Sequence, residues 1–271
     1  MIKKISRLLK KLSLIALIIT LFTFNACKIE YTQAPDSGVD LSNGVITQGI
    51  IEANFTIALT SYNVSLSGRV VNESLSQGSG VVFEKTAAQE GEYKYALLTN
   101  NHVIYKDTSL YTRFDCSVRD YMGNAYRAEV AAFDPNYDLA VVTFTADKDY
   151  KVLSFATQNP KISDDVVSIG QPLGIINAVT EGKVEKYTTL TIATDNGQVN
   201  NSISNVTFEV VRHSAPINSG SSGGALLDKD YKICGINYAA AVVQGSQEFV
   251  SGYAVPVDKV KQFLTEKYYL T

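Results

Sequence analysis

The sequence predicts an all-β protein built from short antiparallel strands. From Gln48 onward, runs rich in Val, Ile, Thr and Tyr alternate with turn residues. The composition also favours strands, since the chain has 16 Tyr residues, no Trp and 45% hydrophobic residues. Because no helical pattern separates these runs, we expect an antiparallel sandwich or barrel.

The expected strands form two series, with a break near residues 148–163. Turn residues such as Gly, Asn, Asp and Pro bound the individual runs. The first series comprises Val64–Val71, Ser79–Glu84, Tyr93–Thr99, Ser109–Val118, Ala125–Phe133 and Leu139–Phe144. The second series comprises Val166–Ile169, Asn177–Tyr187, Leu190–Thr194, Val206–Val211, Ala225–Leu227, Ile233–Tyr238 and Gly252–Val255.

Two helices are expected at the ends of this β-rich region. Ile51–Leu59 is a candidate for a short helix. The stronger helical pattern lies at 256–270, where a proline precedes four apolar residues at helical spacing, Val257, Val260, Phe263 and Leu264.

The first 27 residues have the pattern of a secretory signal peptide. Met1–Lys11 carries five basic residues and no acidic residue, and an apolar run follows from Leu12 to Phe24. This run is shorter than the ~20 residues that a membrane-spanning helix needs. We therefore expect a cleaved signal at 1–27, with a membrane-anchoring helix as the less favoured alternative.

The end of this signal resembles the lipobox of bacterial lipoproteins. In such a motif Cys27, which follows Ala26, becomes the lipidated first residue of the mature protein. This predicts an extracytoplasmic protein bound to the membrane through a lipid anchor. Phe24 stands where the motif usually has Leu, so ordinary secretion remains an alternative. Residues 28–47 are polar and rich in turn residues, and we expect a flexible tether there.

The charge of the chain argues against nucleic-acid binding. The net charge is −3, and removal of residues 1–26 would leave 19 basic against 27 acidic residues, a net charge of −8. Nucleic-acid binding requires clustered Lys and Arg residues. The two remaining cysteines, Cys116 and Cys234, are too few for a disulfide framework, and their pairing stays open. Cys234 lies in an apolar strand, where we expect a small buried hydrophobic residue.

Three polar residues lie where they could combine in one catalytic site. The chain has only two histidines, and His102 follows an apolar strand. Ser222 lies in the Gly/Ser-rich segment 218–226, and a nucleophilic serine needs such a tight turn with nearby backbone N–H groups. Asp138 directly precedes an apolar strand, where its carboxylate could hold an imidazole in one tautomer. Asp134 is a rival carboxylate, but its place before a proline better suits a turn cap.

Together these segments resemble the trypsin-like superfamily of serine proteases, specifically its bacterial HtrA/Deg-type branch. The order His, Asp, Ser along the chain is that of the family, and the resemblance covers roughly Gln48–Leu264. The matching segments are Gly78-Ser79-Gly80-Val81, Thr99-Asn100-Asn101-His102-Val103-Ile104, Asp138-Leu139-Ala140-Val141, Ser168-Ile169-Gly170-Gln171-Pro172-Leu173-Gly174, Val179-Thr180-Glu181-Gly182-Lys183-Val184, Gly235-Ile236-Asn237 and Gly252-Tyr253-Ala254-Val255-Pro256-Val257.

The resemblance implies two perpendicular, antiparallel, six-stranded β-barrels with a C-terminal helix. The domain would extend over 48–271, with the first barrel at about 48–150, the second at about 151–256 and the helix at 257–270. The active site would lie in the cleft between the barrels. The printed sequence continues only briefly beyond the resemblance, so we expect the domain without the PDZ module that usually follows in this branch.

The resemblance also implies the role of each catalytic residue. Ser222 attacks the scissile carbonyl, His102 accepts and returns the proton, and Asp138 orients His102. The oxyanion hole would lie at Gly220, Ser221 and Ser222, with the backbone N–H groups of Gly220 and Ser222 as donors. Ser221 replaces the Asp of digestive enzymes, so we expect activity without cleavage of a propeptide.

The substrate pocket is expected to lack an acidic group. Its residues would come from two segments, Ala215-Pro216-Ile217 and Asn237-Tyr238-Ala239. Ala215 and Pro216 lie where the base of the pocket is expected, so we predict cleavage after small or medium aliphatic residues rather than after Lys or Arg.

The sequence therefore predicts an extracytoplasmic serine endopeptidase acting on proteins or peptides. The alternative is a catalytically silent lipoprotein of the same fold that acts as a binding or adhesion module, because fold does not dictate function. The sequence contains no metal-ligand cluster, phosphate loop or dinucleotide motif, and we expect no cofactor. A solute-binding lipoprotein would require alternating strands and helices, which the strand series opposes.

Overall fold

The computed structural model describes residues 44–89, 91–171, 178–190, 200–243 and 248–270. They all belong to one compact unit, Asp36–Thr271. The expected signal peptide, Cys27 and most of the expected tether lie outside the described residues. So do Pro172-Leu173-Gly174 of one matching segment.

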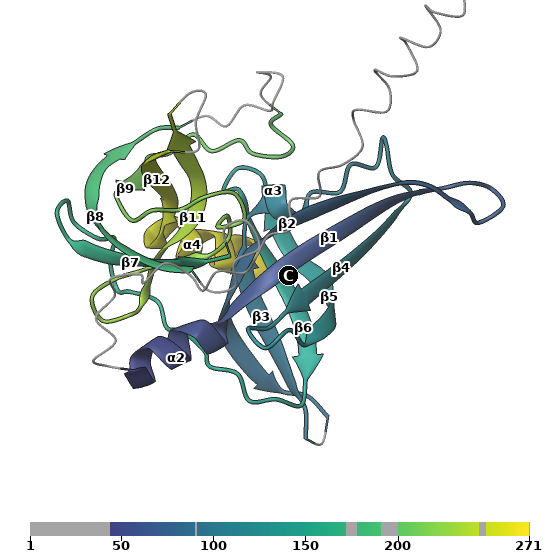
Figure 1. Ribbon diagram of the computed structural model, residues 1–271, viewed down its shortest axis with the longest axis horizontal. Helices are drawn as coiled ribbons and strands as arrows, with labels where there is room; N and C mark the ends of the chain where they lie inside the picture. The colour runs from purple at the N-terminus through teal and green to yellow at the C-terminus, as the bar shows by residue number, and fades with distance from the viewer. Residues whose placement is uncertain (1–43, 90, 172–177, 191–199, 244–247, 271) are drawn as a thin grey trace, which may run out of the picture. The chain divides into compact units, whose positions relative to one another are not determined.

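The first barrel is a closed sheet whose six strands pair antiparallel in the order β1-β2-β3-β6-β5-β4. Because the sheet closes on itself, its strands leave no free edge. Figure 1 shows these strands in purple to teal. They are β1 (Asn54–Val64), β2 (Val70–Ala87), β3 (Tyr93–Thr99), β4 (Arg113–Arg119), β5 (Ala125–Asp134) and β6 (Leu139–Ala146).

The second barrel repeats this arrangement in the order β10-β11-β12-β9-β8-β7. Its strands are antiparallel and appear in green to yellow in Figure 1. The two closed, six-stranded barrels confirm the predicted fold class. The strands are β7 (Asp165–Gly170), β8 (Ala178–Thr188), β9 (Val210–His213), β10 (Ala225–Leu227), β11 (Ile233–Val242) and β12 (Phe249–Pro256).

Short helices flank the barrels within the described residues. The C-terminal helix α4 (Val257–Phe263) continues into a π-helical turn, η4 (Leu264–Tyr268). The apolar residues that predicted this helix are all buried. The other helices are α2 (Gly44–Ala53) and the one-turn α3 (Asn101–Ile104).

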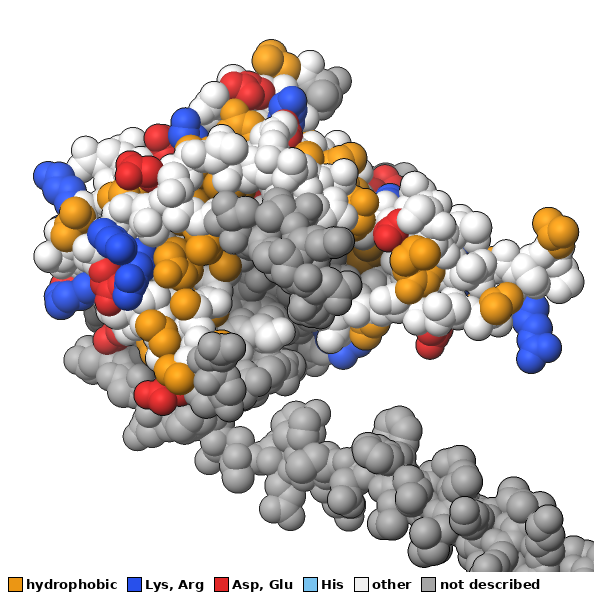
Figure 2. Space-filling model, turned by 90° about the horizontal axis from the view of Figure 1, so that it is seen from above, with side chains coloured by type: hydrophobic (Ala, Val, Ile, Leu, Met, Phe, Trp, Pro, Cys, Tyr) orange, Lys and Arg blue, Asp and Glu red, His pale blue; other side chains and the backbone are white. Residues whose placement is uncertain are grey.

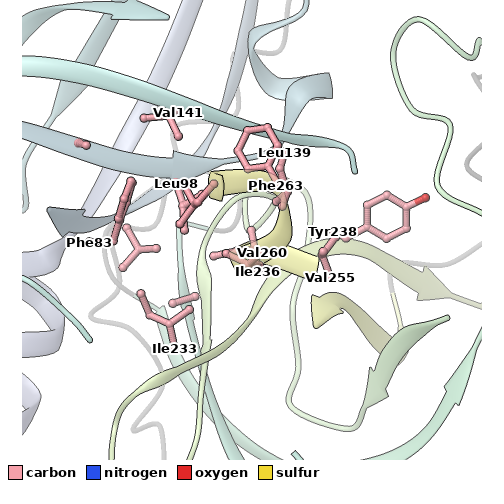
Figure 3. Packing of buried hydrophobic residues seen from close by; sticks show 14 of the residues in the cluster. Phe83, Leu98, Leu139, Val141, Ile233, Ile236, Tyr238, Val255, Val260 and Phe263 are labelled. Atoms are coloured by element: carbon pink, nitrogen blue, oxygen red, sulfur yellow. The ribbon is translucent and has the colours of Figure 1, made fainter. Parts of the chain in front are cut away.

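Alternate residues of β3 and β6 pack into two different cores. Leu97 and Val142 face a core inside the first barrel, whereas Leu98 and Val141 face a core shared with the second barrel and α4. Successive strand residues point to opposite faces, so these two strands carry apolar residues on both faces. Figure 3 shows the shared core, in which Phe83 and Leu98 lie in the same cluster as Ile236, Val255 and Phe263. Each buried apolar side chain contributes roughly 1.5–3 kcal/mol of stability.

The structure corrects three expectations near the beginning of the domain. Ile51–Leu59 is not one helix, because α2 ends at Ala53 and β1 begins at Asn54. Val64–Val71 is not one strand, since a turn at 65–69 separates β1 from β2. The last four residues of the expected tether, 44–47, belong to α2. Phe55, Ile57 and Leu59 are buried at the alternating spacing of a strand, and pairing with β2 and β4 settles their conformation.

Other strand bounds also differ from those expected. β4 begins at Arg113 rather than Ser109, and β9 covers Val210–His213 rather than Val206–Val211. Leu190 is outside any strand, and the rest of the expected strand Leu190–Thr194 lies outside the described residues.

The hairpin of β1 and β2 extends farther than its neighbours. β4 pairs with β1 only over Thr56–Tyr62, while β1 and β2 stay paired as far as Val64 and Val70. Near its tip Leu66 and Val71 are exposed. On the face in Figure 2, hydrophobic side chains form small groups among polar ones.

Candidate active site

His102 and Asp138 form a hydrogen-bonded pair at the ends of two adjacent strands. His102 lies on α3, just after β3, and Asp138 directly precedes β6, the neighbour of β3. His102 Nδ1 lies 2.7 Å from Asp138 Oδ2, and the backbone N–H of His102 donates to Asp138 Oδ1 at 2.8 Å. Both carboxylate oxygens of Asp138 therefore contact His102. Because Nδ1 faces the carboxylate, the other ring nitrogen, Nε2, is directed away from it.

The carboxylate of Asp138 is held in a buried and strained position. Its side chain is 0% exposed, and its backbone adopts a φ of 48°, in the left-handed region. Such a conformation costs on the order of 1–2 kcal/mol for a residue with a side chain. The backbone of Asp138 is bonded on both sides, since its N–H donates to Pro135 O at 3.2 Å and its carbonyl accepts from Asn100 Nδ2 at 2.8 Å.

The rival carboxylate, Asp134, has a different role. Its Oδ1 accepts a hydrogen bond from the backbone N–H of Asn136 at 2.8 Å, which caps the turn before Asp138. Its Oδ2 pairs with Lys267 Nζ at 3.0 Å. The structure therefore confirms Asp134 as a turn cap and places Asp138 beside His102.

The segment between β9 and β10 brings Ser222 to the same end of β3. Ser222 O accepts a hydrogen bond from the backbone N–H of Ser79 at 2.7 Å, and the serine is half-buried. The next residue, Gly223, has a φ of 85°. A Cβ there would lie 2.2 Å from Ser79 O and 2.3 Å from Thr99 Oγ1. Only glycine fits this close approach. The turn of the second barrel thus packs directly against Thr99, three residues before His102.

One contact of a complete triad is not formed in this structure. Among the described residues, no hydrogen bond joins His102 Nε2 to Ser222 Oγ. The His102 side chain is 23% exposed. In the same part of the chain, the backbone N–H groups of Gly220 and Ser222 donate no hydrogen bond to another described residue.

Each of the two expected pocket segments has two buried residues and one more accessible residue. Ala215, Ile217 and Tyr238 are buried, whereas Pro216 is exposed and Ala239 is partly buried. Asn237 is fully buried and joins the serine turn through its backbone: its N–H donates to Gly224 O at 2.8 Å, and its carbonyl accepts from Gly223 N–H at 2.9 Å. β11 therefore runs directly beside the turn that carries Ser222.

His213 has a distinctive environment that the sequence did not predict. Its side chain is buried beside Gly252, and neither ring nitrogen makes a hydrogen bond among the described residues. Burial lowers its pKa to about 4, and the nearby Ala215 backbone and Asn237 side chain oppose this shift only in part. In the sequence, His213 follows Val211 by two positions, so both side chains point to the same face of β9. This spacing is the pattern that could have predicted a buried ring at His213.

Neither cysteine forms a disulfide in the structure. Cys116 lies on β4 and Cys234 on β11, and both thiols are free. Cys234 is fully buried, as predicted, and burial raises its pKa. Within the described residues, no group of His, Cys, Asp and Glu has an arrangement that could hold a metal ion.

Comparisons with known proteins agree with this architecture. The chain is 31% identical to the Serine protease Do-like HtrA of Bacillus subtilis (strain 168) over 231 residues, which cover 84% of this chain and 46% of that protein. It is 28% identical to the Serine protease Do-like HtrA of Lactococcus lactis subsp. lactis (strain IL1403) over 70% of this chain and 44% of that protein. It is 32% identical to a Probable periplasmic serine endoprotease DegP-like of Chlamydia pneumoniae over 59% of this chain and 29% of that protein.

The chain spans only about half the length of these two relatives from Bacillus subtilis and Lactococcus lactis. A family model described as the trypsin-like peptidase domain matches residues 78–236, more than half of the chain. The matched range contains His102, Asp138 and Ser222. This match and the two closed barrels show that the chain belongs to the trypsin-like peptidase family, and its relatives are HtrA-type serine proteases.

Proposed function

We propose that the protein is an extracytoplasmic serine endopeptidase that cleaves protein or peptide substrates with Ser222, His102 and Asp138. The observation that carries this proposal is the pair of contacts from the buried Asp138 carboxylate to His102. The contacts of Ser222 and Gly223 with Ser79 and Thr99 support it further, because Thr99 ends the strand that leads to His102.

The chemistry would follow from these positions. Ser222 Oγ attacks the carbonyl carbon of the scissile bond as its proton moves to His102 Nε2, and Asp138 stabilises the resulting imidazolium. The C–N bond then breaks, Nε2 gives the proton to the departing amine, and an acyl-enzyme remains on Ser222. Water attacks the acyl carbon with His102 again accepting the proton, which releases the new carboxyl end and restores Ser222.

The negative oxygen of each tetrahedral intermediate would need donors close to Ser222. The backbone N–H groups of Gly220 and Ser222 are suited to this role because both are free of partners within the described part of the chain. Loss of one such donor typically lowers the rate by about 10²–10³. Ser221 is buried, and its Oγ accepts from the backbone N–H of Asn218 at 3.2 Å. Ser221 would therefore shape the turn and not contact the oxyanion through its side chain.

The location of the enzyme is part of the same proposal. The signal pattern at 1–27 and the name of the periplasmic relative from Chlamydia pneumoniae support export. Among the described helices, none is long and apolar enough to cross a membrane. We propose lipidation at Cys27 as the anchor. Cys27→Ser should abolish incorporation of labelled palmitate and release the protein from the membrane fraction, and retained label in this variant would contradict the anchor.

Hydrolysis of an unfolded protein tests the proposed activity. The full-length protein should release soluble peptides from fluorescently labelled casein, whereas His102→Ala and Ser222→Ala should not. The second candidate, a silent binding module, is favoured by the missing hydrogen bond between His102 Nε2 and Ser222 Oγ. It predicts that the parent protein binds casein as its variants do and releases no peptides. Such contacts are often long in enzymes without substrate, so the bond alone does not decide between the two.

A further inference from the structure

Ser79 makes four hydrogen bonds where the two barrels meet at the serine turn. It lies on β2 of the first barrel and is fully buried. Its backbone N–H donates to Ser222 O at 2.7 Å, and its Oγ donates to Gly220 O at 2.7 Å. The same Oγ accepts from the backbone N–H of Gln171 at 2.9 Å, and Ser79 O accepts from Thr99 Oγ1 at 2.8 Å.

The direction of the Ser79 hydroxyl proton follows from these contacts. A serine hydroxyl has one proton to donate and can accept through its lone pairs. Because Oγ accepts from Gln171 N–H, its own proton is free to point at Gly220 O, the other partner within hydrogen-bond distance. Ser79 itself is fully buried, so its hydroxyl has these two protein partners in place of water.

This bond restrains the most adaptable residue of the turn. Gly220 has a φ of 96°, and a glycine can rotate to other backbone conformations at little cost. Each peptide unit is rigid, so fixing the carbonyl of Gly220 fixes the plane that continues into Ser221. With Ser222 O also held by Ser79, both ends of the Gly220–Ser222 turn are tied to one residue of the other barrel.

Close packing around Ser79 explains why the contact can form. A Cβ at the preceding Gly78 would lie 2.9 Å from Ser222 O and 2.6 Å from Val103 Cγ2. On the other side, a Cβ at Gly170 would lie 3.2 Å from Ser79 Oγ. The small residues therefore let β2 approach the turn closely enough for direct hydrogen bonds.

We infer that Ser79 is a positioning residue for the proposed proteolysis, because it orients the turn whose Gly220 and Ser222 N–H groups stabilise the oxyanion. This inference rests on the proposed function. Ser79 itself touches no substrate and acts through the two carbonyls that it holds. Its removal should therefore impair the transition state more than the binding of substrate.

Steady-state kinetics of the full-length protein on a fluorogenic peptide that it cleaves test this inference. Ser79→Ala should lower kcat by about 10- to 100-fold, as expected when reacting groups are slightly misplaced, and KM should stay within about threefold. Binding of a peptide aldehyde, whose adduct with Ser222 carries an oxyanion, should weaken by a similar factor. The matched control is Thr56→Val, which removes a partly buried hydroxyl that bonds the Gln171 side chain and neither Gly220 nor Ser222. It should retain kcat within about twofold of the parent.

A second variant separates positioning from folding. Ser79→Cys nearly preserves the volume of the side chain but supplies a much weaker donor. It should keep a Tm close to that of the parent and still lose kcat. A stable Ser79→Cys or Ser79→Ala protein with the parent kcat would overturn the inference, as would an equal loss in Thr56→Val. If the parent itself cleaves no faster than Ser222→Ala, the proposed function fails and the inference fails with it. If the parent cleaves faster than Ser222→Ala but the Ser79 variants have the kcat of the parent, the inference alone fails.

Discussion

The stability of the protein should depend on pH through one buried residue, His213. Its ring is 0% exposed, and a Cβ at Gly252 would lie only 2.1 Å from its Cε1. No charged side chain contributes to its pKa, which burial lowers to about 4. The neighbouring Arg212 points to the opposite face of β9, where it pairs with Glu185 at 2.7 Å.

The sign and size of the effect follow from the two protonation states. In the unfolded chain His213 has a pKa of about 6.5, so between pH 6.5 and 4 the unfolded state binds a proton that the folded state excludes. The contribution to stability is complete above about pH 6.5 and is lost as the pH falls toward about 4. A pKa difference of about 2.5 units corresponds to roughly 3 kcal/mol. This is a large fraction of the roughly 5–15 kcal/mol that stabilises a typical domain.

Urea unfolding at pH 7 and pH 4.5, followed by circular dichroism, measures this loss. All proteins should carry Ser222→Ala, so that self-cleavage cannot interfere. His213→Leu replaces the ring by an apolar side chain and should reduce the stability lost between the two pH values by about 2 kcal/mol. His102→Ala removes the other histidine and should retain the loss. Equal acid sensitivity of the His213→Leu variant and its parent would refute the reasoning.

Two further predictions concern the catalytic residues and the substrate. Asp138→Asn should lower kcat by about 10⁴-fold because the amide favours the wrong tautomer of its histidine partner. Asp134→Asn should keep most of the activity because its amide oxygen can still cap Asn136; equal losses in peptide hydrolysis would contradict this assignment. In a peptide library analysed by mass spectrometry, cleavage should follow small or medium aliphatic residues, since the segment Ala215–Pro216 carries no acid. Rapid cleavage after Lys or Arg would refute this preference.

The sequence predicted those strands best whose pattern allows only one interpretation. Tyr93–Thr99 and Ala225–Leu227 match β3 and β10, because short apolar runs between turn residues suit buried strands. The failure at β1 has a physical cause. Phe55 and Leu59 are four residues apart, which fits one face of a helix, and both also fit the alternation of a strand. Pairing with β2 and β4 decides between the two, and no local pattern contains that information.

The candidate site was predicted residue by residue, but its supports were not. The positions of His102, Asp138 and Ser222 followed from motifs and family resemblance. The roles of Ser79 and His213 depend on which segments meet in space. Ser79 lies 141 residues before Gly220, and His213 faces Gly252 only because β9 pairs with β12. Such contacts come from the order of strands in the barrels, which the sequence pattern does not contain.

Labelling with a fluorophosphonate tests most directly whether Ser222 is an activated nucleophile. The full-length protein should gain the mass of one adduct, mapped to Ser222, whereas folded Ser222→Ala should gain none and His102→Ala should react far more slowly. Each variant should first match the circular dichroism spectrum of the parent. If the well-folded parent gains no adduct, or if the adduct maps to another residue, the central claim is contradicted.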